Sequence, residues 1–337
     1  LTQLENLEVG SNKIVNINPL VGLTELRHLS IQRNEIGDIS VLAGMKKLTY
    51  LAARESLIED ITLLGGLTAL ERLRLQGNQI RELSPLTSLV NLKELDVSGN
   101  QVRSISPVLG LASHLEILGL SFNPVEDLEL LRNTAFHHLK RIFLAGLPMG
   151  DYTFLQNYGQ LENLQLDECG IQNIAFLAGM TSLTTLYLNE NQIANISPLS
   201  ELRNLRTLSL AGNPVGDLSA LSSLTNLTTL DANDVLAGDI SPLANLTKLS
   251  TLMLKHNLIT DVGPLENLAA LSTLDLEDNL IQDVSPLCGL MNLDTLNLLS
   301  NPLSKESHTS YLKTIQANNP GIDLQYDPYD GVLFLTE

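Results

Sequence analysis

Acidic side chains recur every 22 residues in two stretches of the sequence, and rows of carboxylates are a common way of binding calcium. The row comprises Asp38, Asp60, Glu82, Asp217, Asp239, Asp261 and Asp283. Consecutive members would lie about 5 Å apart if each belongs to a neighbouring structural repeat. Alternatively, each carboxylate precedes a short helical turn, where negative charge is favourable. We favour the second interpretation and expect no metal site.

The other reactive side chains show no arrangement that supports catalysis. The six histidines, including the adjacent His137 and His138, lack zinc-ligand spacing, and there is no glycine-rich phosphate loop. No combination of Ser, His and Asp is expected to meet in a pocket. Cys169 and Cys288 are about five repeats apart, or about 24 Å, which excludes a disulfide between them. We expect no catalytic site and no cofactor.

These residues are carried by a repeat. The frame that starts at Leu4 recurs in 14 units of 22 residues, except for one unit of 23 and one of 24. The first residues of the units are Leu4, Leu26, Leu48, Leu70, Leu92, Leu115, Leu139, Leu161, Leu183, Leu205, Leu227, Leu249, Leu271 and Leu293. A period of this length predicts a solenoid, which grows by adding repeats rather than new cores.

Within a unit such as LRTLSLAGNPVGDLSALSSLTN, apolar residues occupy positions 1, 4, 6, 11, 14, 17 and 20. The alternating part predicts a short strand, and strands of successive units should stack about 4.8 Å apart in one parallel sheet. Position 9 is Asn in ten units, and the amides should form a hydrogen-bonded ladder. The ladder comprises Asn12, Asn34, Asn78, Asn100, Asn123, Asn191, Asn213, Asn257, Asn279 and Asn301.

A second recurring element is the sequence Ser-Pro or Asn-Pro later in the unit, as in NINPL and DISPL. We interpret Ser or Asn as a helix N-cap and Pro as the first helical residue, so the convex side should carry short turns. The predicted fold is of the α/β class. It is a curved right-handed horseshoe of about 14 repeats, with a parallel concave sheet and short 3-10 or helical convex turns.

The stretch LTTLYLNENQIANISPLSEL resembles the 22-residue leucine-rich repeat of the bacterial internalins, a length class shared with the leucine-rich regulatory subunit of protein phosphatase 1. The resemblance covers residues 1–303. It implies a non-enzymatic binding protein on a bacterial surface or in the extracellular medium, although neither an N-terminal helical cap nor a cell-wall sorting motif is recognisable. Residues 304–337 resemble a C-terminal cap, with Ser304 as N-cap, a helix to about Asn318 and a last strand.

Side chains at positions 3, 5 and 7 should point out of the concave sheet, because the leucines at positions 4 and 6 point into the core. We expect these residues to bind the partner through a groove that is basic early, apolar in the middle and acidic late. The candidate binding residues are Tyr50, Arg54, Arg72, Arg74, Ile117, Arg141, Phe143, Tyr187, Asp231 and Met253. Aromatic and arginine side chains on a rigid surface are typical of interface hot spots.

Aromatic residues gather at 136–158, after the 23- and 24-residue units. We expect Phe143 and Ile117 to be exposed in a shallow apolar depression with the small residues Gly119, Ser121 and Ala145. Phe136, Tyr152 and Tyr158 fall at or beside inward positions, so a core role is favoured for them. Phe154 and Phe176 replace the usual Pro, which suggests that the convex turns change form there.

The net charge of −18 makes nucleic acid and anionic membranes poor partners. No apolar run is long enough to span a bilayer, and the N-terminus LTQLENLEVG lacks the features of a signal peptide, so we expect a trimmed piece of a larger protein. The partner is therefore expected to be a protein. Two alternatives remain: a cytoplasmic scaffold or regulatory subunit of an enzyme such as a phosphatase, and the recognition arm of a larger enzyme.

Overall fold

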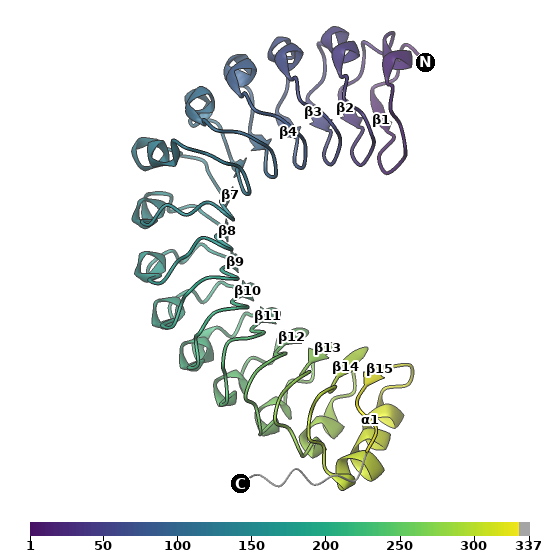
Figure 1. The fold of residues 1–337 in the computed structure, drawn as a ribbon, viewed down its shortest axis with the longest axis vertical. Helices are drawn as coiled ribbons and strands as arrows, with labels where there is room; N and C mark the ends of the chain where they lie inside the picture. The colour runs from purple at the N-terminus through teal and green to yellow at the C-terminus, as the bar shows by residue number, and fades with distance from the viewer. Residues whose placement is uncertain (330–337) are drawn as a thin grey trace. The chain divides into compact units, whose positions relative to one another are not determined.

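Three-residue strands alternate with short 3-10 turns along residues 1–329, which the computed structural model describes (Figure 1). The predicted leucine-rich solenoid architecture is confirmed. The chain divides into two compact units, Leu1–Cys169 and Gly170–Glu337. In each unit the strands line one side and the turns line the opposite side.

The first unit has its strands in sequence order, each parallel to the next. The strands are β1 (Asn6–Glu8), β2 (His28–Ser30), β3 (Tyr50–Ala52), β4 (Arg72–Arg74), β5 (Glu94–Asp96), β6 (Ile117–Gly119), β7 (Arg141–Phe143) and β8 (Asn163–Gln165). The turns are η1 (Asn18–Leu20), η2 (Ser40–Gly44), η3 (Thr62–Gly66), η4 (Ser84–Ser88), η5 (Ser106–Leu111), η6 (Leu128–Asn133) and η7 (Thr153–Asn157).

The second unit repeats the same alternation, again with parallel strands in sequence order. The strands are β9 (Thr185–Tyr187), β10 (Thr207–Ser209), β11 (Thr229–Asp231), β12 (Thr251–Met253), β13 (Thr273–Asp275), β14 (Thr295–Asn297) and β15 (Asp323–Gln325). The helical segments are η8 (Ala175–Leu177), η9 (Ser197–Leu199), η10 (Ser219–Ser223), η11 (Ser241–Leu243), η12 (Gly263–Leu265), η13 (Ser285–Gly289), the π-helical η14 (Ser307–Tyr311) and α1 (Leu312–Asn318).

The core is a stack of leucines in register. Leu29 pairs with Leu51 and Leu51 with Leu73 in the first unit, and Leu208 pairs with Leu230 in the second. All five side chains are fully buried. One repeat cannot cover its own leucines. Each repeat is therefore stabilised by burying them against the repeats on either side.

The N-cap interpretation of the Ser-Pro sequence is wrong. Ser241, for example, is the first residue of its 3-10 turn and makes no side-chain cap. The N–H of Ser241 is instead bonded to Asp239 Oδ1 at 2.8 Å, two residues earlier. Such Asx-type bonds suit a turn too short for an ordinary N-cap. The same bond is made by Asp38, Asp60, Asp151, Asp217, Asp261 and Asp283, and by Asn16, Asn173 and Asn195.

The position-9 amides connect neighbouring repeats. Asn213 Nδ2 donates to the carbonyls of Leu210, in its own repeat, and Leu188, in the preceding one, each at 2.8 Å. Its Oδ1 accepts the N–H of Ile193 at 3.0 Å. Asn213 is only 1% exposed, so these bonds satisfy backbone groups that water cannot reach. In the four repeats that lack this Asn, position 9 is Ser56, Leu147, Cys169 and Val235.

Aromatic side chains of the 24-residue repeat and of the repeat after it pack in the core of the first unit. Phe136, Tyr152 and Tyr158 are each 4% exposed, so the predicted core role is confirmed. The Phe136 and Tyr158 rings meet edge to face at 5.5 Å, and Tyr158 donates to the Leu131 carbonyl at 2.7 Å. The expected change of turn form at Phe154 is wrong, because η7 is an ordinary 3-10 turn that buries this ring.

Phe176 is also buried, in the 3-10 turn η8. The backbone after η8 does change form: Ala178 has a ψ of 125° and Gly179 a φ of 89°, whereas the residues that follow η9 and η11 are helical. The expected change is therefore found after η8 and not in η7.

The helix predicted after Leu303 is present and is followed by β15. Ser304 Oγ accepts the N–H of Ser307 at 3.2 Å, as an N-cap does. The assignment of residues 304–337 as a cap stays a proposal. Residues 330–337, which include part of the predicted cap and tail, lie outside the described residues.

Candidate functional site

The side of the strands that points away from the core carries positions 3, 5 and 7 in both units, and we call it the strand face. In the first unit its centre is an aromatic and guanidinium cluster on β2, β3 and β4. The His28 and Tyr50 rings stack at 4.1 Å and 6°. The Arg74 guanidinium lies 5.6 Å from the Tyr50 ring centroid, within the range of a cation–π contact. The cluster therefore adds side-chain contacts between three strands that already pair through their backbones.

Two of the predicted arginines are already engaged within the chain. Arg74 donates to Glu94 through Nε, at 2.5 Å, and through a terminal nitrogen, at 3.3 Å. The hydrogen bond with Glu94 raises the pKa of Arg74. Arg54 donates to the Gln32 side chain at 2.8 Å through Nε. Their donors are therefore partly used before any partner arrives.

Arg72 and Arg141 differ from this pair. Both side chains are exposed on the strand face, on β4 and β7. Neither guanidinium has a hydrogen bond or ion pair with any residue in the described part of the chain. Their forked donors remain available for carboxylates of a partner.

The expected shallow depression around Gly119 is wrong. Ser121 and Ala145 are buried rather than flanking an exposed hollow. The space above Gly119 is filled by the Asp96 carboxylate, since a Cβ at Gly119 would lie 2.2 Å from Asp96 Oδ1. Asp96 is itself only 7% exposed and accepts a hydrogen bond from Gln76 at 2.7 Å. Polar side chains thus close the region that was expected to be apolar.

Ile117 and Phe143 are half-buried on the adjacent strands β6 and β7, where Ile117 pairs with Arg141 and Gly119 with Phe143. An aromatic residue not selected from the sequence lies close in the chain. Phe122, three residues after the end of β6, is 50% exposed, and its ring covers Gly146, where a Cβ would lie 2.7 Å from the ring.

Phe122 stands at position 8, where the backbone is left-handed in every repeat. Glycine occupies this position four times, at Gly77, Gly99, Gly146 and Gly212. Glycine recurring at position 8 is the sequence signal for a tight left-handed turn, and this turn keeps the side chain at position 8 out of the core.

The strand face of the second unit is far more uniform. Position 3 is threonine on every strand from β9 to β14, with neighbouring threonines paired in register. The predicted residues Tyr187, Asp231 and Met253 are half-buried at position 5 of β9, β11 and β12. Burial raises the pKa of the Asp231 carboxyl, which accepts a hydrogen bond from Ser209 Oγ at 3.3 Å.

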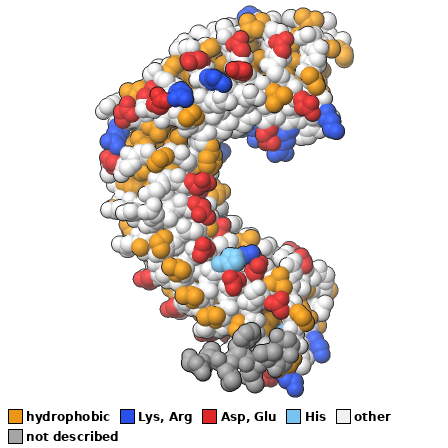
Figure 2. All heavy atoms as spheres, in the orientation of Figure 1, with side chains coloured by type: hydrophobic (Ala, Val, Ile, Leu, Met, Phe, Trp, Pro, Cys, Tyr) orange, Lys and Arg blue, Asp and Glu red, His pale blue; other side chains and the backbone are white. Residues whose placement is uncertain are grey.

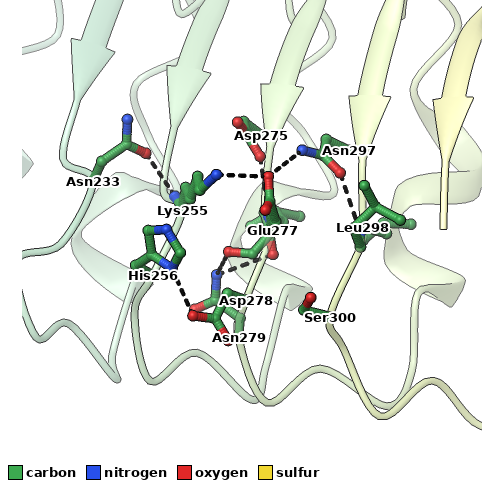
Figure 3. Close-up of polar contacts among 12 residues, drawn as sticks. Asn233, Lys255, His256, Asp275, Glu277, Asp278, Asn279, Asn297, Leu298 and Ser300 are labelled. Carbon is green, nitrogen blue, oxygen red and sulfur yellow. Dashed lines mark hydrogen bonds and ion pairs between the residues drawn. The ribbon is translucent and has the colours of Figure 1, made fainter. Parts of the chain in front are cut away.

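Charged side chains of the second unit pair with one another near the ends of β12 and β13 (Figure 3). Lys255 Nζ lies 2.9 Å from Glu277 Oε2, and this contact raises the pKa of Lys255 and lowers that of Glu277. Asn297 donates to the same Glu277 oxygen at 2.9 Å. His256 Nδ1 lies 2.5 Å from Asp278 Oδ2. The acidic end of the predicted groove is thus partly neutralised.

A hollow of about 500 Å³ lies on the first unit beside the 24-residue repeat. It is lined by residues 132–137 and 157–160. The loop before Phe136 carries the two extra residues of this repeat, and the Phe136 and Tyr158 side chains are buried. The hollow therefore borders the segment in which this repeat is longer than the others.

No group of three or more His, Cys, Asp or Glu side chains within residues 1–329 is placed to hold a metal ion. Neither Cys169 nor Cys288 forms a disulfide with a described residue, and burial raises the pKa of the Cys169 thiol, which lies 3.3 Å from the Leu144 carbonyl. No helix of the described chain has the length and apolar character required to span a bilayer.

Comparison with protein families identifies the repeat. A model described as Leucine Rich repeats (2 copies) matches residues 68–110, 160–201, 203–245 and 247–289. An internalin (inlF) from Listeria monocytogenes is 33% identical, with a TM-score of 0.68 over 81% of this chain and 80% of the internalin chain. No curated protein sequence matches this chain.

Two further solved structures share the fold. A leucine-rich repeat protein of Leptospira interrogans is 24% identical, with a TM-score of 0.75 over 96% of this chain and 84% of its own. The ectodomain of the Arabidopsis thaliana receptor kinase GASSHO1/SCHENGEN3, in complex with CASPARIAN STRIP INTEGRITY FACTOR 2, is 21% identical. Its TM-score is 0.68 over 96% of this chain and 44% of the ectodomain.

Proposed function

This chain belongs to the leucine-rich repeat family, with internalin-like repeats, and we propose that it is a non-enzymatic protein that binds another protein through the strand face of its first unit. The observation that carries the proposal is the pair of exposed guanidinium groups of Arg72 and Arg141, which have no partner among the described residues. Half-buried Ile117 pairs with Arg141 on a strand between the two arginines, and half-buried Phe143 is on the same strand as Arg141. Arginine and aromatic side chains on a fixed surface are typical of binding hot spots.

The surrounding contacts supply rigidity. Tyr50 is held between the His28 ring and the Arg74 guanidinium, and Arg74 is held by the buried Glu94. Side chains that are already ordered lose little conformational entropy when a partner binds. We assign Tyr50, Arg54 and Arg74 to a preorganised platform and Arg72, Arg141 and Phe143 to direct contacts.

The chemistry of the partner follows from the available donors. Two exposed guanidinium groups favour carboxylates, and the neighbouring apolar side chains favour an aliphatic or aromatic group between them. We propose a protein partner with an acidic and apolar contact patch, met outside the cell or at the surface of a bacterium, as the likeness to the Listeria internalin suggests. Tyr187, Asp231 and Met253 are assigned to the rim of contacts in the second unit.

The test is a comparison of the wild-type chain with the variant R72E/R141E/F143A. Each immobilised protein is exposed to solubilised host or bacterial surface proteins, and retained proteins are quantified by mass spectrometry. A true partner should be retained at least about tenfold less by the variant, because two donors become carboxylates and the apolar contact is lost.

The charge-matched control is K13E/R103E/V90A, at exposed positions outside the strands of the same unit. It should retain the partner as the wild type does. Equal retention by wild type and R72E/R141E/F143A of every captured protein would contradict the proposal.

A further inference from the structure

A row of exposed leucines runs along one flank of the second unit, apart from the strand face. Position 10, just after the turn at position 8, is Leu236, Leu258 and Leu280 in three successive repeats. These side chains are 52%, 53% and 49% exposed. Pro214 and Pro302 continue the row at either end. We call these five residues the leucine row.

Such a row is not required by the repeat. In the first unit position 10 is Lys13, Glu35, Leu57, Gln79, Gln101, Pro124 and Pro148, so an exposed leucine occurs there only once. Both units nevertheless build the same turn and the same core. Three adjacent exposed leucines form a continuous apolar strip, which a soluble surface seldom carries without a binding role.

The leucine row is bordered by carboxylates on both sides. Asp234 and Asp278 stand at position 8, and Asp239, Asp261 and Asp283 stand at position 13 of the same repeats. All five are exposed. Positions 8 to 13 of these three repeats contain no Lys or Arg, and the basic group among them is His256, which is paired with Asp278. Hydrophobic and acidic side chains lie together over the second unit in Figure 2.

The backbone at Leu236 adds an independent observation. Leu236 has a φ of 62°, in the left-handed region that disfavours residues other than glycine. The strained turn is held by Asn257 Oδ1, which accepts the N–H of Val235 at 3.2 Å and of Ala237 at 2.9 Å. A leucine that is both strained and half exposed is unfavourable for the isolated protein. Strain of this kind is typical of sites under functional constraint.

We propose that the leucine row binds a basic amphipathic helix of a partner protein. The charges of the border require Lys or Arg on both sides of the apolar stripe of the partner. The spacing favours a helix. Strands are about 4.8 Å apart, and repeats lie further apart at the flank because the strands line the inner side of the unit (Figure 1). One helical turn of about 5.4 Å therefore presents one apolar residue to each repeat.

Two other occupants are disfavoured by the same charges. Residues 170–337 contain 18 Asp and Glu against 6 Lys and Arg, so a second copy would bring like charges to the row. An anionic membrane surface would be repelled for the same reason. An anionic membrane supplies no positive groups, and a second copy of the chain has a net charge of −18.

The test uses a fluorescein-labelled peptide of about 18 residues, with leucine on one helical face and lysine on the other. Its binding to the full chain is followed by fluorescence anisotropy. The variant L236S/L258S/L280S should bind the peptide at least about tenfold more weakly than the wild type, since the apolar contact is removed. The matched control V21S/L57S/V90S removes three exposed apolar residues from the first unit and should bind as the wild type does.

The contribution of the border is tested with D239N/D261N/D283N. Asparagine retains the oxygen that accepts the N–H of residues 241, 263 and 285, so the turns are kept and only the charge is lost. Affinity should fall by about threefold or more at low salt, and the difference should disappear in about 1 M salt.

Three results would overturn the proposal. The first is equal peptide binding by the wild type and L236S/L258S/L280S. The second is equally tight binding of a peptide in which serine replaces every leucine, since charge alone would then account for binding. The third is dimerisation of the wild type, measured by sedimentation velocity, that L236S/L258S/L280S abolishes, because a second copy would then occupy the row. All variants are first compared by circular dichroism, and none changes the strand face on which the proposed function depends.

Discussion

The strands of the first and second units share one backbone but present different surfaces. Position 3 of the first unit is Asn6, His28, Tyr50, Arg72, Glu94, Ile117, Arg141 and Asn163, whereas in the second unit it is threonine on six strands. Threonine is β-branched and suits a strand, so the second unit has the residue that best serves the fold. The varied side chains of the first unit contribute no comparable benefit to folding. The contrast supports the proposal that the first unit carries the recognition surface.

The asparagine ladder at position 9 also differs between the two units. Three of its four departures from Asn, at Ser56, Leu147 and Cys169, lie in the first unit, and the second unit has one, at Val235. The first unit also contains the 23- and 24-residue repeats and the buried aromatic cluster. The irregular frame therefore coincides with the more varied strand face.

The largest expected effect is a difference in stability between two substitutions at position 9, one of an Asn of the ladder and one of a residue that replaces Asn. Replacing Asn213 by Ala leaves the Leu188 carbonyl and the Ile193 N–H buried without this partner, so stability should fall by about 3 kcal/mol. Ser56 Oγ is buried and has no hydrogen-bond partner within the described residues. Ser56→Ala should therefore change stability by less than about 0.5 kcal/mol.

Urea unfolding followed by circular dichroism measures both variants. Equal losses of stability in the two variants would contradict the prediction. They would show that Asn213 contributes no more to stability than the unpaired hydroxyl of Ser56.

A smaller effect is expected from acid, and it should be the same in both units. The hydrogen bond from the backbone of Ser219 lowers the pKa of Asp217, and that of Ser241 lowers the pKa of Asp239. A carboxyl whose pKa is lower in the folded state stabilises the fold above its unfolded value of 3.8, and this stabilisation is lost as the pH falls through the folded pKa.

D217N/D239N should therefore lose less stability than the wild type between about pH 5 and pH 2, because Asn keeps the acceptor and does not titrate. D38N/D60N in the first unit should behave alike, since the pKa values of Asp38 and Asp60 are lowered by equivalent bonds. Thermal unfolding midpoints across this range measure the effect. A difference between the two variants would show that the turns are not equivalent.

The smallest effect is expected from the threonine row. T207V/T229V/T251V keeps the shape and the β-branching of each side chain, so stability should change by less than about 0.5 kcal/mol per site. Affinity for a partner identified with R72E/R141E/F143A should change by less than about twofold. A larger loss in T207V/T229V/T251V than in R72E/R141E/F143A would move recognition to the second unit.

Much of the fold follows from the sequence, because each repeat has the same pattern of apolar and turn-forming residues. The spacing of leucines predicts the strand and the core, and Phe136, Tyr152 and Tyr158 were predicted as buried from their register alone. The prediction that Ser before Pro is a helix N-cap was wrong. An Asx bond to a short 3-10 turn and a helix N-cap use the same residue types, so the sequence did not distinguish them.

The candidate site was harder to predict. The register shows which side chains point outward, but not what they meet once there. Arg72 and Arg74 are indistinguishable in the sequence, yet Arg74 is engaged by Glu94 from the next repeat, and Asp96 covers Gly119. Such contacts join residues about 22 positions apart and depend on side-chain length and direction.

The sequence by itself determined the repeat, the strand register and the residues of the core, because burial of leucines at fixed positions has one periodic solution. Only the tertiary structure decided which charges remain available and which leucines stay exposed. Packing of neighbouring repeats leaves Arg72 and Arg141 without partners among the described residues, and it leaves Leu236, Leu258 and Leu280 on the surface. These properties arise between repeats, where no local pattern specifies them.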